Sequence, residues 1–203
     1  MKQELSTREK ICQVSYELFM EKTFDKTTMR EIADRLGINL SLVNYHFPRK
    51  QEILFAIFGK MIEEAQQEAR EVAKDNEILM VYLSFFYFFP NLISRKYHNM
   101  LSSWVGRVSK ENIDIYGKFL PLNDKIVKFL NLPLTEEELR LRNVYIFAGF
   151  KELIKLYLIG EIKVSEKEFI DMLFENMGRL LGIADYIVED TKVKGAPYIN
   201  IEA

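Results

Sequence analysis

Signals for the start of a helix recur along this sequence. In four places a serine or threonine is followed three residues later by glutamate, next to apolar residues at helical spacing. The four pairs are Ser6 with Glu9, Thr28 with Glu31, Thr135 with Glu138, and Ser165 with Glu168. In such a capping box each side chain accepts a backbone N–H that would otherwise lack a partner. Glycine and proline are sparse, with 9 and 5 in 203 residues, and alternation typical of strands is nearly absent until the last few residues. The sequence therefore predicts an all-α fold.

The N-terminal part predicts three short helices followed by a long one. The expected ranges are about 6–23, 28–36, 39–46 and 49–74. Gly37 can end the second helix in a left-handed conformation, and Asn39 or Ser41 can cap the third. Pro48 suits the first turn of the fourth helix, where no N–H donor is needed. This fourth helix should connect the N-terminal unit to the rest of the chain.

The second and third helices have the features of a helix-turn-helix. A tight turn between two helices needs a small inward residue and a residue that tolerates positive φ, and Ala33 and Gly37 meet these demands. The apolar residues expected to clamp the pair onto the first helix are Ile32, Leu36, Ile38 and Val43. Such a pair places its second helix in the major groove of DNA. The sequence therefore favours DNA binding.

Residues 27–54 resemble the TetR family of transcriptional regulators. The most characteristic part is Tyr45-His46-Phe47 followed by Lys50 and an apolar pair at residues 53–54. The resemblance covers about residues 8–58. It implies a helix-turn-helix DNA-binding domain of three helices, residues 1–50, and a larger helical ligand-binding and dimerisation domain, residues 51–203. It also implies no enzymatic activity and no cofactor.

The resemblance assigns DNA contacts residue by residue. Thr28 and Arg30, with Lys50, would meet phosphates. The third helix would present Leu40, Ser41, Leu42, Asn44, Tyr45 and His46 to the major groove or the backbone. Asn44 stands where many members have tyrosine, and its amide can pair with adenine. Each of three residues has an alternative role: packing against the fourth helix for Tyr45, a hydrogen bond to a local backbone group for His46, and simple solvation for Lys50.

The C-terminal part predicts further helices near 76–90, 93–109, 111–131, 136–160 and 165–182, with an irregular tail after about Asp190. Aromatic residues crowd these helices and predict a buried core. A sensor domain of the family would keep a cavity for a small, mostly hydrophobic effector there. Candidate lining residues are Phe86, Phe89, Trp104, Tyr116 and Tyr145, for each of which a purely structural role is the alternative.

The last two long helices are the predicted homodimer interface. Most family members dimerise through this pair, here residues 136–160 and 165–182, and two copies can read a palindromic operator on double-stranded DNA. Both helices carry more apolar residues than one internal face needs. The expected set is Phe147, Phe150, Leu153, Ile154 and Tyr157 with Phe169, Met172, Leu173, Met177, Leu180 and Leu181.

Composition excludes several other classes of protein. The net charge is −2, but residues 1–60 contain ten basic and eight acidic residues, which places the basic excess in the expected DNA-binding part. Two histidines and a single cysteine offer neither a metal pattern nor a nucleophilic dyad. The N-terminus has no secretory signal. The longest apolar run, about residues 78–89, is shorter than the roughly 20 residues that span a bilayer. A cytoplasmic protein without membrane contact is expected.

Two alternatives remain at this point. The helix-turn-helix could belong to a protein-interaction module that never touches DNA, or the regulator could activate transcription and not repress it. Substitutions at Asn44, Tyr45 and Lys50 distinguish the first alternative from a DNA-binding protein. They should abolish DNA binding while the fold stays intact, whereas an interaction module should be unaffected by them. The sequence does not decide the second.

Overall fold

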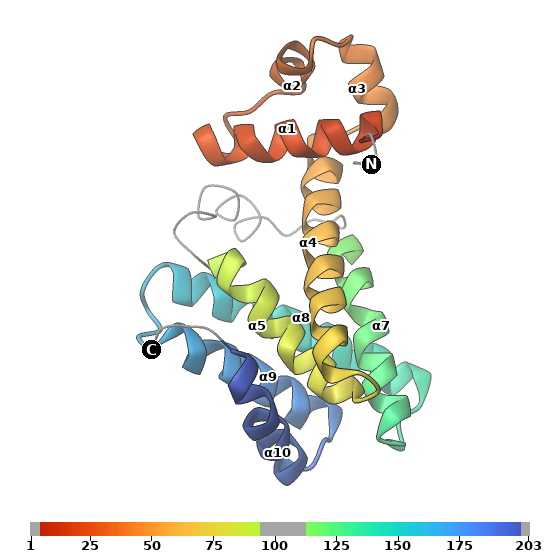
Figure 1. Ribbon diagram of the computed structural model, residues 1–203, viewed down its shortest axis with the longest axis vertical. Coiled ribbons are helices and arrows are strands. Elements are labelled where there is room, and N and C mark those ends of the chain that lie inside the picture. The colour runs from red at the N-terminus through yellow and green to blue at the C-terminus, as the bar shows by residue number, and fades with distance from the viewer. Residues whose placement is uncertain (1–4, 94–112, 200–203) are drawn as a thin grey trace. The chain divides into compact units, whose positions relative to one another are not determined.

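The computed structural model describes residues 5–93 and 113–199, and their regular secondary structure is helical throughout (Figure 1). The helices are α1 (Thr7–Lys22), α2 (Met29–Leu36), α3 (Leu40–His46), α4 (Lys50–Ala73), α5 (Glu77–Ile93), α7 (Ile113–Phe129), α8 (Glu136–Leu158), α9 (Glu166–Leu181) and α10 (Asp185–Gly195), followed by a 3₁₀ turn, Ala196–Tyr198. The all-α prediction is confirmed. The helix predicted near 93–109 lies outside the described residues.

All four predicted capping boxes form. In each, the hydroxyl accepts the N–H three residues on, and the glutamate accepts the N–H of the capping residue. Gly37 ends α2 in the left-handed conformation, at φ 66°. Asn39, not Ser41, caps α3, because its Oδ1 accepts the Ser41 N–H at 2.9 Å. Helix α4 begins at Lys50, so Pro48 lies just before the first turn and not within it.

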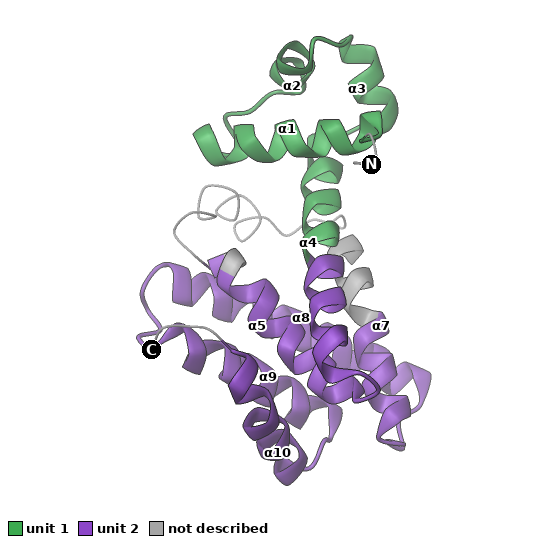
Figure 2. Cartoon of the chain, viewed as in Figure 1, with its two compact units in different colours: residues 1–61, 94–115 green, residues 62–93, 116–203 purple. Residues whose placement is uncertain are grey.

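The chain forms two compact units (Figure 2). Unit 1 comprises residues 1–61 and 94–115, and unit 2 comprises residues 62–93 and 116–203. The boundary falls inside α4, whose residues 50–61 belong to unit 1 and whose residues 62–73 belong to unit 2. The division into domains after residue 50 stays a prediction.

The core of unit 1 joins its first three helices to the start of α4. Helix α2 packs against both α1 and α3. The largest buried side chains of this core are Ile11, Phe19, Ile32, Phe47, Ile53 and Phe58. Ala33 and Val43 are buried as the turn pattern predicts, and Leu36 and Ile38 are partly buried. The apolar residues predicted from spacing therefore hold α2 against α1 and α3 against α2.

Aromatic rings from three helices meet in the core of unit 2. On α5, Phe85 contacts Phe150 of α8 and Phe174 of α9 edge-on, with ring centroids 5.8 and 5.9 Å apart. Phe89 also contacts Phe85 and Phe150. These edge-to-face contacts are the arrangement that aromatic pairs prefer. The aromatic crowding predicted to be buried is a packed cluster.

Helix α5 continues through Pro90 to Ile93, whereas the sequence predicted an end at Pro90. A proline inside a helix removes one backbone hydrogen bond and costs about 3 kcal/mol. Ile93, in the turn that follows the proline, is buried, and burying such a side chain contributes about 1.5–3 kcal/mol. Its apolar contacts therefore offset much of the cost of the proline. No helix in the described ranges combines the length and the apolar character that crossing a bilayer requires.

The segment after Asp185 is a helix and not the irregular tail that the sequence predicted beyond Asp190. Helix α10 packs against α5 and α9. Gly195, at its end, lies so close to Tyr82 that a Cβ there would come within 2.4 Å of the ring. Val188 lies similarly close to Gly178 of α9, where an added Cβ would come within 2.9 Å of it. Two glycines thus allow α10 to approach its neighbours.

A polar link crosses the interior of unit 2. The hydroxyl of the fully buried Tyr82 donates to Asp171 Oδ1 at 2.9 Å, and Lys167 Nζ lies 2.7 Å from Asp171 Oδ2. Burial and the hydrogen bond to Asp171 raise the pKa of Tyr82 far above its ordinary value. The hydroxyl is therefore a permanent donor that ties α5 to α9.

Candidate functional site

The start of α2 is fixed by a compact set of charged and polar contacts. Glu31 accepts the N–H of Thr28 at 2.8 Å, and the Thr28 hydroxyl also donates to it at 3.0 Å. The ammonium of Lys22, at the end of α1, pairs with the other oxygen of Glu31. Thr28 is therefore the capping residue of α2. A phosphate that binds here would contact Thr28 in addition to its hydrogen bonds with Glu31.

Acid should weaken this part of the fold. Hydrogen bonds from Lys22 and from Thr28 lower the pKa of Glu31 from 4.5 to about 2. A carboxyl whose pKa is lower in the folded state stabilises the fold above its unfolded pKa and loses that contribution as the pH falls through the folded value. We therefore expect the melting temperature to decrease between pH 4.5 and about 2, and to decrease less in Glu31→Gln. Thermal denaturation followed by circular dichroism measures this, and identical pH profiles would contradict it.

The outward face of α3 carries the predicted reading residues. Ser41, Leu42, Asn44 and Tyr45 are exposed, Tyr45 by 80%, while Leu40 and His46 are partly exposed. Val43, on the opposite face, and Phe47, the residue that ends the helix, are fully buried. The Ser41 hydroxyl donates to Asn39 at 3.0 Å, and the rings of Tyr45 and His46 meet edge-on. The structure thus brings all six predicted residues onto one short helix with its other face anchored.

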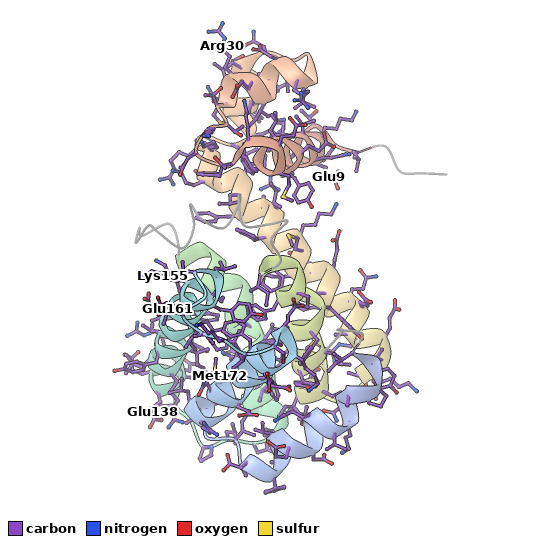
Figure 3. All side chains as sticks on the ribbon, turned by 90° about the vertical axis from the view of Figure 1, so that its left-hand side faces the viewer. Glu9, Arg30, Glu138, Lys155, Glu161 and Met172 are labelled. Atoms are coloured by element: carbon purple, nitrogen blue, oxygen red, sulfur yellow. The ribbon has the colours of Figure 1, made fainter. Side chains whose placement is uncertain are left out.

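The cations around α3 differ in what they bind. Arg35 pairs with Glu21 at 3.0 Å, and Lys22 with Glu31. Arg30 is exposed on α2 and, within the described part of the chain, makes no ion pair. Figure 3 shows its side chain extending away from the helix. Its guanidinium is therefore available for an anion such as a phosphate.

Lys50 is engaged with the loop between α1 and α2. Its ammonium donates to the carbonyls of Phe24 and Thr27, each at 2.6 Å, and lies 3.5 Å from that of Asp25. The same nitrogen lies 4.3 Å from the centre of the Phe24 ring. The predicted phosphate residue is thus turned towards its own backbone in this structure.

Arg8 is a candidate that the sequence pattern did not indicate. Its guanidinium lies over the ring of Phe47, 4.6 Å from the ring centre, at the end of α3. The contact holds an exposed cation next to the reading helix. Residues 8 and 47 are far apart in the sequence, so helical periodicity carries no signal for this pairing.

The predicted effector residues are not all brought together. Phe86 and Phe89 are buried on α5. Tyr145, in contrast, is 67% exposed on α8, so the prediction that it lines an interior cavity is wrong for this chain. The α8 positions that face the core are the ones next to it, Ile146 and Phe147. Trp104 and the side chain of Tyr116 lie outside the described residues.

Known proteins share both the N-terminal motif and the fold. Residues 11–57 match the family model described as bacterial regulatory proteins, tetR family. No curated protein matches the chain. A TetR transcriptional regulator from Rhodococcus sp. RHA1 has a TM-score of 0.63 at 18% identity, over 86% of this chain and 95% of that one.

Two further solved structures cover nearly all of the chain. RolR in complex with resorcinol has a TM-score of 0.66 at 15% identity, over 91% of this chain and 92% of that one. The fatty acid degradation regulator FadR from Bacillus halodurans has a TM-score of 0.55 at 15% identity, over 89% and 97%. At such low identity the likeness shows a common fold, and the larger helical part is included in it.

Proposed function

We propose that this chain, which belongs to the TetR family of DNA-binding transcriptional regulators, represses transcription from a palindromic operator and is released when a small, mostly apolar molecule binds. Members of this family are generally not enzymes, and we propose no catalytic activity. Among the described residues no group of histidine, cysteine, aspartate and glutamate is placed to hold a metal ion. The cytoplasmic location stays a prediction.

The exposed face of α3 is the observation that carries the proposal. Asn44 and Tyr45 present hydrogen-bonding groups to solvent, while Val43 on the opposite face is fully buried. A helix anchored in this way can enter a major groove without rearrangement of its unit. The exposed Arg30 supplies a cation for the phosphate backbone, which positions a protein on DNA.

Each exposed residue has a proposed contact. Asn44 would pair with adenine through two hydrogen bonds, and Leu40 and Leu42 would touch thymine methyl groups. Tyr45 and His46 would reach the backbone or base edges. The hydroxyls of Ser41 and Thr28 already donate to Asn39 and Glu31, so any contact of theirs with DNA would be made in addition to these hydrogen bonds.

Selection from random duplex DNA tests the function directly. The full chain is mixed with random-sequence duplexes, bound fragments are recovered and amplified, and the enriched sequence is read. We expect an inverted repeat, with half-sites about one helical turn apart for two copies of α3. Failure to enrich any sequence, together with no binding to duplex DNA at low salt, would refute a DNA-binding function.

Exposed apolar residues on α8 and α9 support dimerisation through these helices. Regulators of this family act as dimers. Leu141, Val144 and Tyr145 are exposed and, at helical spacing, lie on the same outward face of α8. Leu180 is exposed on α9. The set expected from sequence is different in detail: Phe147, Phe150, Ile154, Phe169, Leu173, Met177 and Leu181 are buried within the chain itself. We therefore propose the same pair of helices but the opposite face of α8.

A charge placed on this face should separate the protomers. Val144 is 57% exposed in the single chain, so Val144→Glu should leave the fold intact. Burying a carboxylate in an apolar interface would weaken association by about 2 kcal/mol or more, roughly 30-fold or more in the dissociation constant. Sedimentation at micromolar concentration measures it. Tyr186→Glu, at a 75% exposed position of α10, is the matched control and should remain dimeric. Loss of the dimer in both variants, or in neither, would contradict the assignment.

The effector is proposed to be mostly apolar because the interior of unit 2 is built from aliphatic side chains together with a cluster of aromatic ones. Phe86 and Phe89 remain the candidate contacts. RolR has been solved with resorcinol, and FadR is named for fatty acid degradation. Thermal-shift measurements with resorcinol and with a medium-chain fatty acid are a first test, since a ligand at 100 times its Kd stabilises the folded state by about 2.7 kcal/mol. No shift with aromatic or acyl compounds would count against an apolar effector.

Helix α4 is the proposed connection between effector and operator. Its second half belongs to unit 2 and its first half to unit 1, so a displacement of the helix by a ligand would change the placement of α3. Moving the population from mostly bound to mostly released needs about 4–5 kcal/mol of difference in affinity between the two states. Operator affinity that is unchanged by a saturating ligand would refute this mechanism.

A further inference from the structure

The loop between α1 and α2 determines where the helix-turn-helix begins. Thr27 is buried, and its hydroxyl donates to the Thr23 carbonyl at 2.9 Å. Phe24 is also buried and contacts Phe19 of α1 edge-on, with ring centroids 5.1 Å apart. The next residue after Thr27, Thr28, caps α2. Any shift of this loop therefore displaces α2, and with it α3, which packs against α2.

The ammonium of Lys50 has as many N–H donors as this loop has carbonyl acceptors close to it. A lysine has three N–H donors, and three loop carbonyls, of Phe24, Asp25 and Thr27, lie within 3.5 Å of Nζ. The face of the Phe24 ring provides a further favourable surface for the cation. To bind a phosphate, the ammonium would have to give up hydrogen bonds to carbonyls that it already makes.

We propose that Lys50 is a positioning residue of the DNA-binding unit, which holds the α1–α2 loop and thereby sets the placement of α2 and α3, and that it does not bind a phosphate. The inference rests on the proposed DNA-binding function. It reverses the role that the sequence assigned to Lys50. It also explains why the cation stands at the first residue of α4, where its side chain reaches back to a loop more than twenty residues earlier.

The salt dependence of operator binding separates the two roles. Each phosphate that a protein neutralises contributes about −0.9 to the slope of log affinity against log salt. The full chain and its variants are titrated onto the selected operator fragment between about 50 and 200 mM salt. For a positioning residue, Lys50→Met should bind about ten-fold more weakly at every salt concentration, with the wild-type slope. If Lys50 instead neutralises a phosphate, the slope of Lys50→Met would be shallower by about 0.9, which would overturn the inference.

Lys50→Arg keeps the charge and provides the second test. The planar guanidinium cannot direct its donors at three converging carbonyls as an ammonium does. We expect weakened binding in this variant as well, at the wild-type slope. Wild-type affinity of Lys50→Arg would favour a phosphate role and overturn the inference, and this test remains decisive if Lys50→Met does not fold. Arg30→Gln is the control for a residue that does bind phosphate and should show the reduced slope.

A purely structural role of Lys50 is also distinguishable. Circular dichroism identifies a temperature at which every variant is fully folded, and binding is measured there. Wild-type affinity of Lys50→Met under those conditions would mean that the lysine only stabilises the unit, which contradicts positioning. A wild-type chain that binds no duplex DNA would instead refute the DNA-binding function itself.

Discussion

The variant Gly195→Ala should be less stable than the wild-type protein by about 1–3 kcal/mol, although alanine in a helix is normally more favourable than glycine by about 1 kcal/mol. The backbone of Gly195 has φ −79° and ψ −27°, which any residue adopts. The requirement is therefore purely steric. An added Cβ would come within 2.4 and 2.6 Å of Tyr82 Cε1 and Cδ1.

The ring of Tyr82 has little freedom to move away. It is fully buried, contacts Phe86 and Phe174 edge-on, and its hydroxyl is bound to Asp171. Helix α10 must therefore shift. Urea denaturation followed by circular dichroism measures the decrease in stability. Val193→Ala, at a 71% exposed position of the same helix, should change stability by less than about 0.5 kcal/mol. A Gly195→Ala protein as stable as the wild type would show that α10 does not pack on Tyr82.

The largest effect on operator binding is expected at Asn44 and Tyr45. Each of the variants Asn44→Ala and Tyr45→Ala should weaken binding by about 1–3 kcal/mol, roughly 5- to 150-fold. Both side chains are exposed, so the melting temperature should remain that of the wild type. Anisotropy titrations with a labelled operator fragment measure the affinity.

The preference for operator over random DNA distinguishes residues that read bases from residues that bind the DNA backbone. If Asn44 pairs with an adenine, Asn44→Ala should lose its preference at that one base pair and retain the wild-type salt dependence. Arg30→Gln, in contrast, should weaken binding to all duplexes alike and reduce the salt slope. An equal decrease in affinity for operator and random DNA in Asn44→Ala would place this residue outside the reading surface.

Local rules were enough to predict most of unit 1. The capping boxes at Ser6 and Thr28, and the left-handed Gly37, depend on residues a few positions apart, and all form as expected. Val43 is buried because its spacing already places it on the inward face of α3, and Phe47, the residue that ends this helix, is buried as well. Of the residues assigned to the reading face, Ser41, Leu42, Asn44 and Tyr45 are exposed for the same reason, and Leu40 and His46 are partly exposed.

Long-range contacts account for what the sequence did not predict. Helix α10 depends on the fit of Gly195 against Tyr82, more than a hundred residues away, and its own charged composition is typical of a tail. Tyr145 looked like a core aromatic because periodicity marks apolar residues without saying whether they face their own core or the surface. Lys50 resembles a phosphate-binding residue of the family in sequence, but only the three-dimensional structure shows the carbonyls that surround its ammonium.

The hydrogen bond between Tyr82 and Asp171 also determines the alignment of α5 with α9. Phenylalanines recur along α5, so a slide of one helical turn, about 5.4 Å, would still place aromatic rings against α9. It would, however, leave a buried carboxylate oxygen without its donor, which is strongly unfavourable. An aromatic surface that could accept several registers is thus restricted to one of them by a single hydroxyl group.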